Sequence, residues 1–188
     1  AIELIDLGKT FGQDEVLTHV NRTFEAGKIH GVVGNNGSGK TVMFKLICGF
    51  LQPTSGKVFV QGKQIGKDAD FPEDLGLIIE TPGFLPQLSG LRNLEILAGL
   101  KKKIGLKEVA AVIRSVVLDP LSNKPVGKYS LGMRQRLGIA QAIMEEPSLL
   151  ILDEPMNGLD KNGVAEMREL FRSLATDGRT ILLASHNI

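Results

Sequence analysis

The most informative segment of the chain is an eight-residue stretch near residue 40 that is rich in glycine. The pattern G-x-x-x-x-G-K-[ST] of a phosphate-binding loop is matched by Gly34, Asn35, Asn36, Gly37, Ser38, Gly39, Lys40 and Thr41. Glycines let backbone N–H groups turn toward phosphate oxygens, and a helix start adds partial positive charge. We expect Lys40 to reach the β- and γ-phosphates and the Thr41 hydroxyl to bind Mg²⁺. The segment predicts nucleoside triphosphate binding, because a plain glycine turn gives no reason for Lys and Thr here.

Two adjacent acids follow a second apolar run. Residues 149–152 are all apolar, as is typical of a parallel strand buried on both faces, and the run ends in Asp153 and Glu154. Neighbouring positions of a strand point to opposite sides, so the two acids can serve two tasks. We expect Asp153 to hold Mg²⁺ opposite Thr41, and Glu154 to polarise the attacking water as a general base. Taken alone, the run could also be a strand that meets solvent.

The elements that must position these residues alternate along the chain. A strand-like run at 29–33 precedes the glycine loop, and a helix-like run at 42–47 follows it. Apolar spacing predicts further strands at 2–7, 16–24, 57–61, 75–79, 149–152 and 180–184, and helices at 91–100, 107–118, 130–144 and 162–175. The alternation predicts an α/β fold, with an antiparallel β subdomain and a mostly helical subdomain at about 81–145.

Length and composition set further limits. The 188 residues suit one domain, 1–188, and the net charge of +1 gives no whole-chain argument for nucleic-acid binding. We interpret the basic cluster at 101–103 as a solvated helix end and the single cysteine, Cys48, as buried packing. No apolar run is long enough to span a bilayer, and no signal-peptide pattern is present. Because the sequence lacks an initial Met and ends at Ile188 just after a strand-like segment, we expect a C-terminally trimmed piece of a longer protein.

Five motifs, taken in order, resemble the ATP-binding cassette of ABC transporters. They are the phosphate loop and residues 129–133, 152–155, 158–160 and 185–186. The phosphate loop alone indicates only a P-loop NTPase, whereas the ordered set is specific to ABC ATPases and covers essentially the whole chain. The resemblance implies Mg²⁺-dependent ATP hydrolysis in which Lys40, Glu154 and His186 are catalytic. It also implies that two such domains, equal or different, sandwich two ATP molecules head to tail.

The resemblance assigns further residues to this dimer. Ser130 and Gly132 match the signature motif and would donate to the γ-phosphate of ATP bound on the partner domain. Leu131 and Met133 depart from the usual signature residues, which bears on the strength of that contact. Asp160 matches the D-loop and is expected to act across the dimer interface.

Three more positions take roles from the family. Glu80 stands where glutamine is usual in the Q-loop; its carboxylate could bind Mg²⁺, repel the γ-phosphate when no metal is present, or simply face solvent. His186 matches the switch histidine that senses the γ-phosphate. Phe11 matches the aromatic residue that stacks on adenine, and a place in the core is its alternative. The two remaining histidines, His19 and His30, we interpret as structural.

The resemblance also implies a partner in the membrane. Residues 81–92 correspond to the segment where such cassettes meet an integral membrane permease, and Phe84, Leu85 and Leu88 there could dock a short helix or pack the subdomain. The sequence at 79–84 is similar to antibiotic- and lantibiotic-export cassettes. We therefore expect a cytoplasmic protein, peripheral on the cytoplasmic face of the membrane, with no nucleic-acid partner.

Two other functions stay open. One is a soluble ABC ATPase that acts on DNA or the ribosome, although such proteins usually carry long coiled-coil insertions or two cassettes. The other is a regulatory subunit with little turnover, which the presence of both Glu154 and His186 disfavours.

Overall fold

The computed structural model describes residues 1–186, and within them the strands form two four-stranded sheets. The antiparallel sheet has the order β2-β1-β4-β5, with β1 (Ile2–Phe11), β2 (Asp14–Phe24), β4 (Ser55–Val60) and β5 (Lys63–Gln64). The parallel sheet has the order β3-β8-β7-β6, with β3 (Ile29–Val33), β6 (Leu75–Ile78), β7 (Leu149–Asp153) and β8 (Thr180–Ser185).

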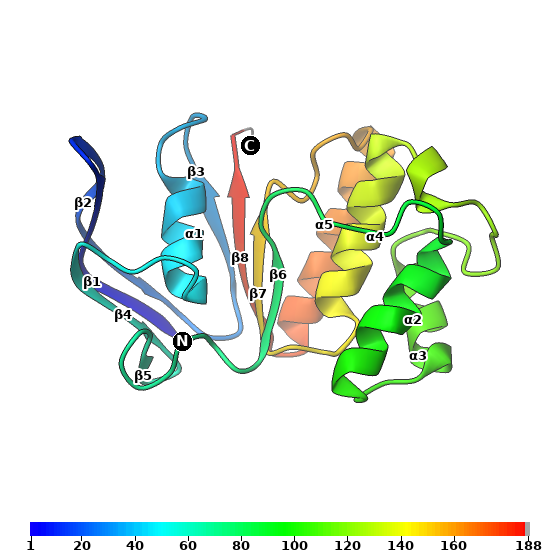
Figure 1. Cartoon of the computed structure of the whole chain (residues 1–188), viewed down its shortest axis with the longest axis horizontal. Helices are drawn as coiled ribbons and strands as arrows, with labels where there is room; N and C mark the ends of the chain where they lie inside the picture. Colours follow the sequence, from blue (N-terminus) through cyan, green and yellow to red (C-terminus); the bar gives the residue numbers. More distant parts are fainter. Residues whose placement is uncertain (187–188) are drawn as a thin grey trace.

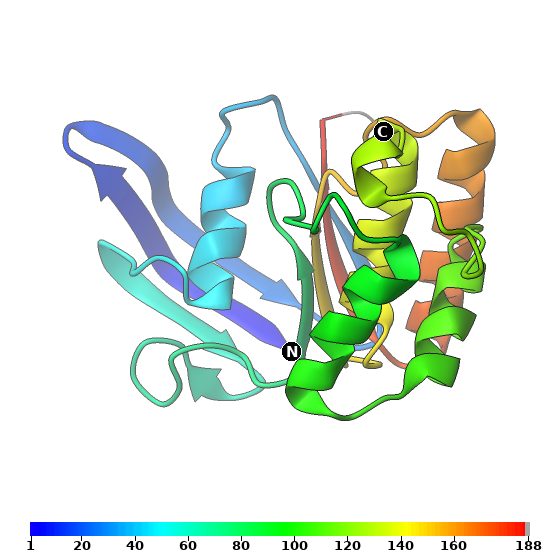
Figure 2. The same cartoon turned by 45° about the vertical axis from the view of Figure 1, so that its right-hand side comes forward.

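The helices separate and cover these sheets. Helix α1 (Lys40–Cys48) lies between the two sheets, while α4 (Leu131–Ile143) and α5 (Lys161–Thr176) cover the other face of the parallel sheet (Figure 1). Helices α2 (Gly90–Lys101) and α3 (Leu106–Ser115) lie outside α4, away from that sheet (Figure 2). A short 3-10 turn, η1 (Val126–Lys128), leads into α4.

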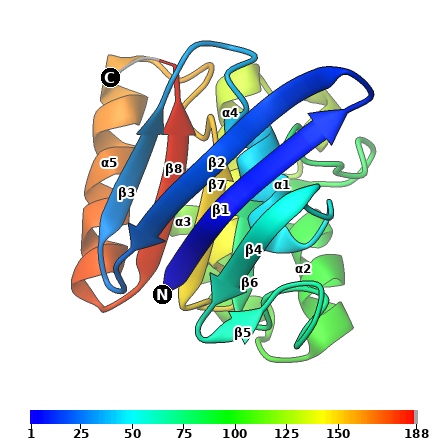
Figure 3. The same cartoon turned by 90° about the vertical axis from the view of Figure 1, so that its left-hand side faces the viewer.

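One hydrophobic core joins α1 to both sheets. Figure 3 shows the antiparallel sheet crossing in front of α1 and the parallel sheet. Side chains of α1 such as Phe44 and Ile47 are buried against Leu4 of β1 on one side and Ile151 of β7 on the other. Each such side chain contributes roughly 1.5–3 kcal/mol through removal of apolar surface from water. The helix that begins at the phosphate loop is thereby fixed from both sides.

A second core lies on the other face of the parallel sheet. Leu137 of α4 and Phe171 of α5 are buried there with Leu150 and Leu152 of β7. The side chains of β7 before Asp153 are therefore covered on both faces, which explains its continuous apolar run.

The strand order brings distant segments to one edge. Strand β8 lies between β3 and β7, and the register places Val33 beside Ser185 and Asp153 beside Ala184. Because all these strands are parallel, their carboxyl ends meet at the same edge, where the phosphate loop also begins. The fold thus collects residues from near 34, 80, 154 and 186 in one place.

The predicted α/β fold with an antiparallel β part is confirmed; the differences are the short strand β5 and the turn η1, which were not predicted, and several element ends. Strands β1 and β2 extend to Phe11 and Asp14, which pair directly across a two-residue turn. The helix expected at 107–118 ends at Ser115, because Val117 adopts the left-handed conformation with φ 63°. Residues 81–145 contain α2, α3 and α4, and their division as a subdomain stays a prediction.

The sequence predicts no membrane-spanning segment. Among residues 1–186, no helix combines the length and the apolar character required to cross a bilayer.

Candidate functional site

The glycine-rich loop joins β3 to α1 and needs glycine at two of its positions. Gly39 precedes the first residue of α1 with φ 90°, in the left-handed region that side chains disfavour. Gly37, in the middle of the loop, is likewise left-handed, with φ 82°. Glycine at both places therefore allows the backbone to close tightly over the start of α1, where the helix N–H groups point outward.

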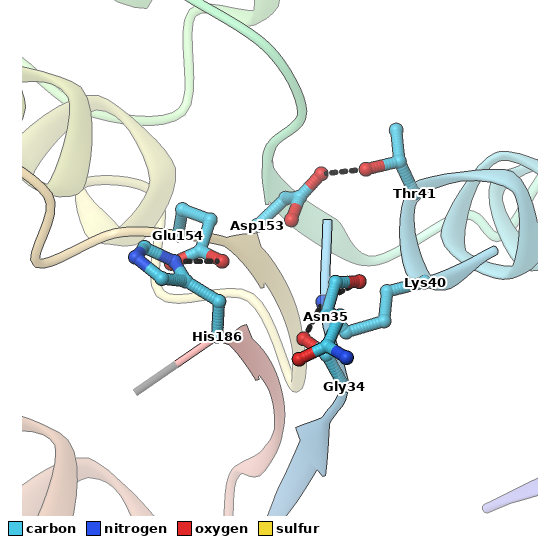
Figure 4. A network of polar contacts seen from close by, with 7 residues as sticks. All are labelled: Gly34, Asn35, Lys40, Thr41, Asp153, Glu154 and His186. Carbon is cyan, nitrogen blue, oxygen red and sulfur yellow. Dashed lines mark hydrogen bonds and ion pairs between the residues drawn. The ribbon is translucent and has the colours of Figure 1, made fainter. Parts of the chain in front are cut away.

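Lys40 is the first residue of α1 and turns back over the loop. Its ammonium group donates to the carbonyl oxygens of Gly34 and Asn35, the latter at 3.0 Å (Figure 4). Both acceptors belong to the loop that phosphate would occupy, so phosphate oxygens can take their place as acceptors for the same ammonium group.

Thr41 and Asp153 connect α1 to the end of β7. The Thr41 hydroxyl donates to Asp153 Oδ2 at 2.5 Å (Figure 4). A hydroxyl and a carboxylate facing each other are oxygen donors of the type that Mg²⁺ prefers. This pair therefore fits a magnesium ion held between the loop helix and the sheet edge.

The neighbouring acid points the other way. Glu154 Oε1 lies 2.8 Å from His186 Nδ1, while Asp153 is directed toward α1 (Figure 4). The backbone of Glu154 is left-handed, with φ 50°, and its N–H donates to the carbonyl of Ala184 at 3.0 Å. Strand β8 thus holds Glu154 in a conformation that costs a non-glycine residue about 1–3 kcal/mol, as is found at functional sites.

A cleft of about 460 Å³ contains most of the predicted residues. Its walls are Phe11, Val16, residues 36–42, Asp153 and Glu154. The Phe11 side chain is 44% exposed, and the Lys9 ammonium lies 5.1 Å from its ring centre. Phe11 is therefore outside the core and beside the loop, as a base-stacking residue would be, and that role stays a prediction.

The signature residues lie outside this cleft. Ser130 begins α4 as its N-cap, accepting a hydrogen bond from the N–H of Met133 at 3.1 Å. A Cβ on Gly132 would approach the Gly158 carbonyl to 3.0 Å, and Leu131 packs on Gly158. Asp160, which is also expected to act across an interface, caps α5 by accepting from the N–H of Gly163 at 2.7 Å.

Glu80 is also separate from the cleft walls. It follows β6, and its carboxylate forms an ion pair with Lys45 of α1, Nζ to Oε1 at 2.6 Å. The sequence reasoning missed Lys45. The signal that could have found it is its position one helical turn after Thr41, on the same face of α1.

The loop after Glu80 is organised by a buried amide. The Asn93 side chain is 4% exposed; it accepts from the N–H of Leu85 at 2.7 Å and donates to the Leu85 carbonyl at 3.0 Å. Phe84 packs half-buried against the helical core, whereas Leu85 is exposed. Phe84 therefore packs at least partly on the subdomain, Leu85 is the more accessible apolar side chain, and the docking role of this loop stays a prediction.

The remaining histidines and the cysteine lie elsewhere. His30 Nε2 is 2.8 Å from the Glu25 carbonyl, and His19 is paired with Asp6, which raises the pKa of His19 through the hydrogen bond and the carboxylate charge. Cys48 is buried, and desolvation raises its pKa to about 12.

Comparison with known proteins gives a consistent picture. A family model described as ABC transporter matches residues 17–157. The chain is 41% identical over 186 residues to YybJ of Bacillus subtilis, an uncharacterized ABC transporter ATP-binding protein, covering 99% of this chain and 85% of YybJ. It is 42% identical to the bacitracin transport ATP-binding protein BcrA of Bacillus licheniformis, with 98% of this chain and 61% of BcrA covered. For the lantibiotic transport ATP-binding protein SrtF of Streptococcus pyogenes, the identity is 35%, covering 98% of this chain and 80% of SrtF.

Solved structures share the fold. The dimeric ABC transporter cassette MJ0796 superimposes with a TM-score of 0.87 at 24% identity, covering 100% of this chain and 88% of that one. The cbiO1 protein of Clostridium perfringens, part of an ABC transporter complex, gives a TM-score of 0.83 at 26% identity, covering 99% of this chain and 78% of cbiO1.

Proposed function

The chain belongs to the ABC transporter family of ATP-binding proteins, and from this membership we propose that it binds and hydrolyses MgATP to power transport through a separate membrane-spanning subunit. One observation carries the proposal. The hydrogen-bonded pair Thr41–Asp153 and the pair Glu154–His186 lie side by side at the sheet edge, beside the cleft that the phosphate loop lines. This is the arrangement that phosphoryl transfer to water needs, because it provides a cation site and a base at one phosphate.

Each residue of the site has a task in this proposal. Lys40 and the loop N–H groups hold the phosphates. Thr41 and Asp153 would hold Mg²⁺, which would offset the phosphate charge. Glu154 accepts a proton from the water and is oriented by His186 Nδ1, and His186 would contact the γ-phosphate through its other ring nitrogen. Within residues 1–186 no cluster of three or more His, Cys, Asp or Glu forms a metal site by itself, which fits a magnesium ion completed by phosphate oxygens.

A second cassette domain completes the site in this proposal. Ser130 and Gly132 are remote from the cleft of their own chain but lie at the start of α4, where helix N–H groups can receive an anion. A head-to-tail dimer, with equal or different partners, would bring them to the partner's γ-phosphate. Asp160 would act at the same interface from the start of α5.

The relatives suggest the kind of cargo and the place of action. BcrA and SrtF are named for bacitracin and lantibiotic transport, so we propose a peptide antibiotic as the cargo of the membrane partner. The protein would act at the cytoplasmic face of the membrane without a nucleic-acid partner. These names favour transport over action on DNA or the ribosome.

The test is purification of the tagged full-length protein from detergent-solubilised cells, with partners identified by mass spectrometry and ATP hydrolysis measured on the same sample. We expect a multi-spanning membrane protein in stoichiometric amount, together with Mg²⁺-dependent ATPase activity. Ribosomal or DNA-bound partners, with no membrane protein, would overturn the transport proposal.

A further inference from the structure

The pair formed by Lys45 and Glu80 joins the loop helix to the strand end beside the catalytic acids. Lys45 lies on α1 one turn beyond Thr41, and Glu80 lies two residues past the end of β6. Their charged atoms are 2.6 Å apart. In the parallel register Ile78 stands opposite Leu152, so Glu80 reaches the same edge of the sheet as Asp153 and Glu154. Three carboxylates therefore share the edge at which a triphosphate would end.

The backbone of Glu80 is constrained, although its side chain is exposed. Its backbone is left-handed, with φ 66°, which is unfavourable for a residue with a side chain. Its side chain is 67% exposed, whereas that of Lys45 is 29% exposed. The lysine is the more fixed partner, and the carboxylate is the one that has room to turn.

Charge decides what such a carboxylate does near nucleotide. A free carboxylate repels a polyphosphate, but it attracts a divalent cation that the polyphosphate carries. An ammonium group in contact with the carboxylate suppresses both effects. Lys40 cannot take this task here, because it contacts carbonyl groups of the loop.

We propose that Lys45 is a positioning residue for Glu80. The ammonium group of Lys45 keeps the Glu80 carboxylate beside α1 and competes for this carboxylate with magnesium-bound nucleotide. The inference rests on the proposed binding of ATP at the phosphate loop. Lys45 would thereby set how strongly the affinity for nucleotide depends on Mg²⁺.

The experiment compares ATP affinity with and without Mg²⁺, using a fluorescent ATP analogue and the full-length protein, first in EDTA and then in excess Mg²⁺. In Lys45→Met the freed carboxylate weakens binding in EDTA and strengthens it in Mg²⁺. The ratio of the dissociation constant in EDTA to that in Mg²⁺ is therefore expected to be about fivefold or more higher than in the parent protein.

Three further variants separate this effect from others. Lys45→Arg keeps the ion pair and is expected to keep the parent ratio. Glu80→Gln removes the carboxylate and leaves Lys45 unpaired, so it is expected to lower the ratio. In Lys45→Met/Glu80→Gln the ratio should return to the parent value or below. Lys57→Met removes the same charge from β4 and should leave the ratio within about twofold, because screening limits distant charges.

The outcomes distinguish this inference from the proposed function. If Lys45→Met weakens binding equally in both conditions, Lys45 contacts phosphate directly and the inference is wrong. It is also wrong if the ratio is unchanged in both Lys45→Met and Glu80→Gln. If the parent protein binds the analogue in neither condition, it is the ATP-binding proposal itself that fails.

Discussion

At the residue scale, two neighbouring acids are separated by the direction of their side chains. Asp153 ends β7 and faces Thr41, whereas Glu154 leaves the strand with a left-handed backbone and faces His186. The N–H of Glu154 still makes the regular parallel-ladder hydrogen bond to the carbonyl of Ala184, so the backbone departs from strand geometry only at Glu154 itself. The change of conformation between adjacent residues is what directs one carboxylate toward Thr41 and the other toward His186.

Replacement of Glu154 should therefore separate binding from chemistry. In Glu154→Gln the side chain keeps its shape but cannot take a proton, so we expect phosphate release to fall roughly 10²–10⁴-fold. MgATP affinity should stay within about twofold of the parent value, because the Thr41–Asp153 pair proposed to hold the metal is untouched. Phosphate release and equilibrium binding are measured on the same samples. Glu146→Gln, at an exposed glutamate near Arg179, is the matched control, and a Glu154→Gln protein with parent-like turnover would exclude the general-base role.

Cys48 offers a residue-scale test of the core. Burial raises its pKa to about 12, so the thiolate is scarce at pH 8 in the folded protein. We expect no reaction with a thiol reagent such as DTNB under native conditions and one reactive thiol per chain after denaturation, since the sequence has one cysteine. Rapid labelling of the native protein, followed by absorbance, would show that α1 is not packed as described.

The residues that could be predicted from the sequence belong to local patterns. The phosphate loop, Asp153 and Glu154 are recognisable because a few consecutive residues specify both the turn and the chemistry. Lys45 and Asn93 were not found, because their partners come from other segments and only the fold brings them together. The roles of the predicted site residues remain predictions until binding and turnover are measured.

At the element scale, helix ends are decided by backbone conformations that apolar spacing does not reveal. Apolar spacing predicted α2 closely, but it extended α3 past Ser115 because Val116 and Leu118 are apolar and bury like helix residues. The left-handed Val117 between them ends the helix instead. Similarly, α2 ends at Lys101, and the capping residue that follows, Lys102, is left-handed with φ 55°.

Lys102 gives a prediction about the stability of α2. Glycine adopts the left-handed conformation without steric cost, so Lys102→Gly should raise the free energy of unfolding by about 0.5–1 kcal/mol. The neighbouring Lys101 is helical, so Lys101→Gly should lower the free energy of unfolding by a similar amount, up to about 1 kcal/mol. Urea denaturation measures both. Destabilisation by both changes would mean that Lys102 contributes a contact greater than its conformational cost.

The loop that follows Glu80 is the element expected to meet the membrane subunit. Its backbone is fixed by Asn93, so an exposed apolar residue on it presents a stable surface. We expect Leu85→Asp to retain ATP binding and thermal stability but to lose co-purification with the membrane partner, because a carboxylate opposes apolar docking. Ile96→Asp, on the exposed part of α2, is a control for added charge. Unchanged co-purification of the Leu85 variant would place the docking surface elsewhere.

At the scale of the whole molecule, the signature residues do not line the cleft of their own chain, and in the proposed dimer a second cassette domain would bring the two together. A Glu154→Gln protein that retains MgATP should therefore form a dimer on size-exclusion chromatography with light scattering. Ser130→Arg should abolish that dimer in the Glu154→Gln background while leaving MgATP affinity within about twofold.

The control for this change is another helix cap. Ser89 begins α2 as Ser130 begins α4, so Ser89→Arg loses a comparable cap worth about 1 kcal/mol but should not prevent dimer formation. If both variants dimerise as the parent does, the start of α4 does not lie at the dimer interface.

The place of β8 in the parallel sheet has a consequence for how the protein is made. This strand is synthesised long after β3, yet it lies between β3 and β7 and supplies the hydrogen bonds of both. On the ribosome, β3 must therefore wait without its sheet neighbour while the chain between β3 and β8 emerges and folds. Closure of the sheet depends on a contact between distant parts of the sequence, which makes it a slow step. Nucleotide affinity should consequently appear late in biogenesis, and chaperones would meet a nascent chain whose central sheet is still open.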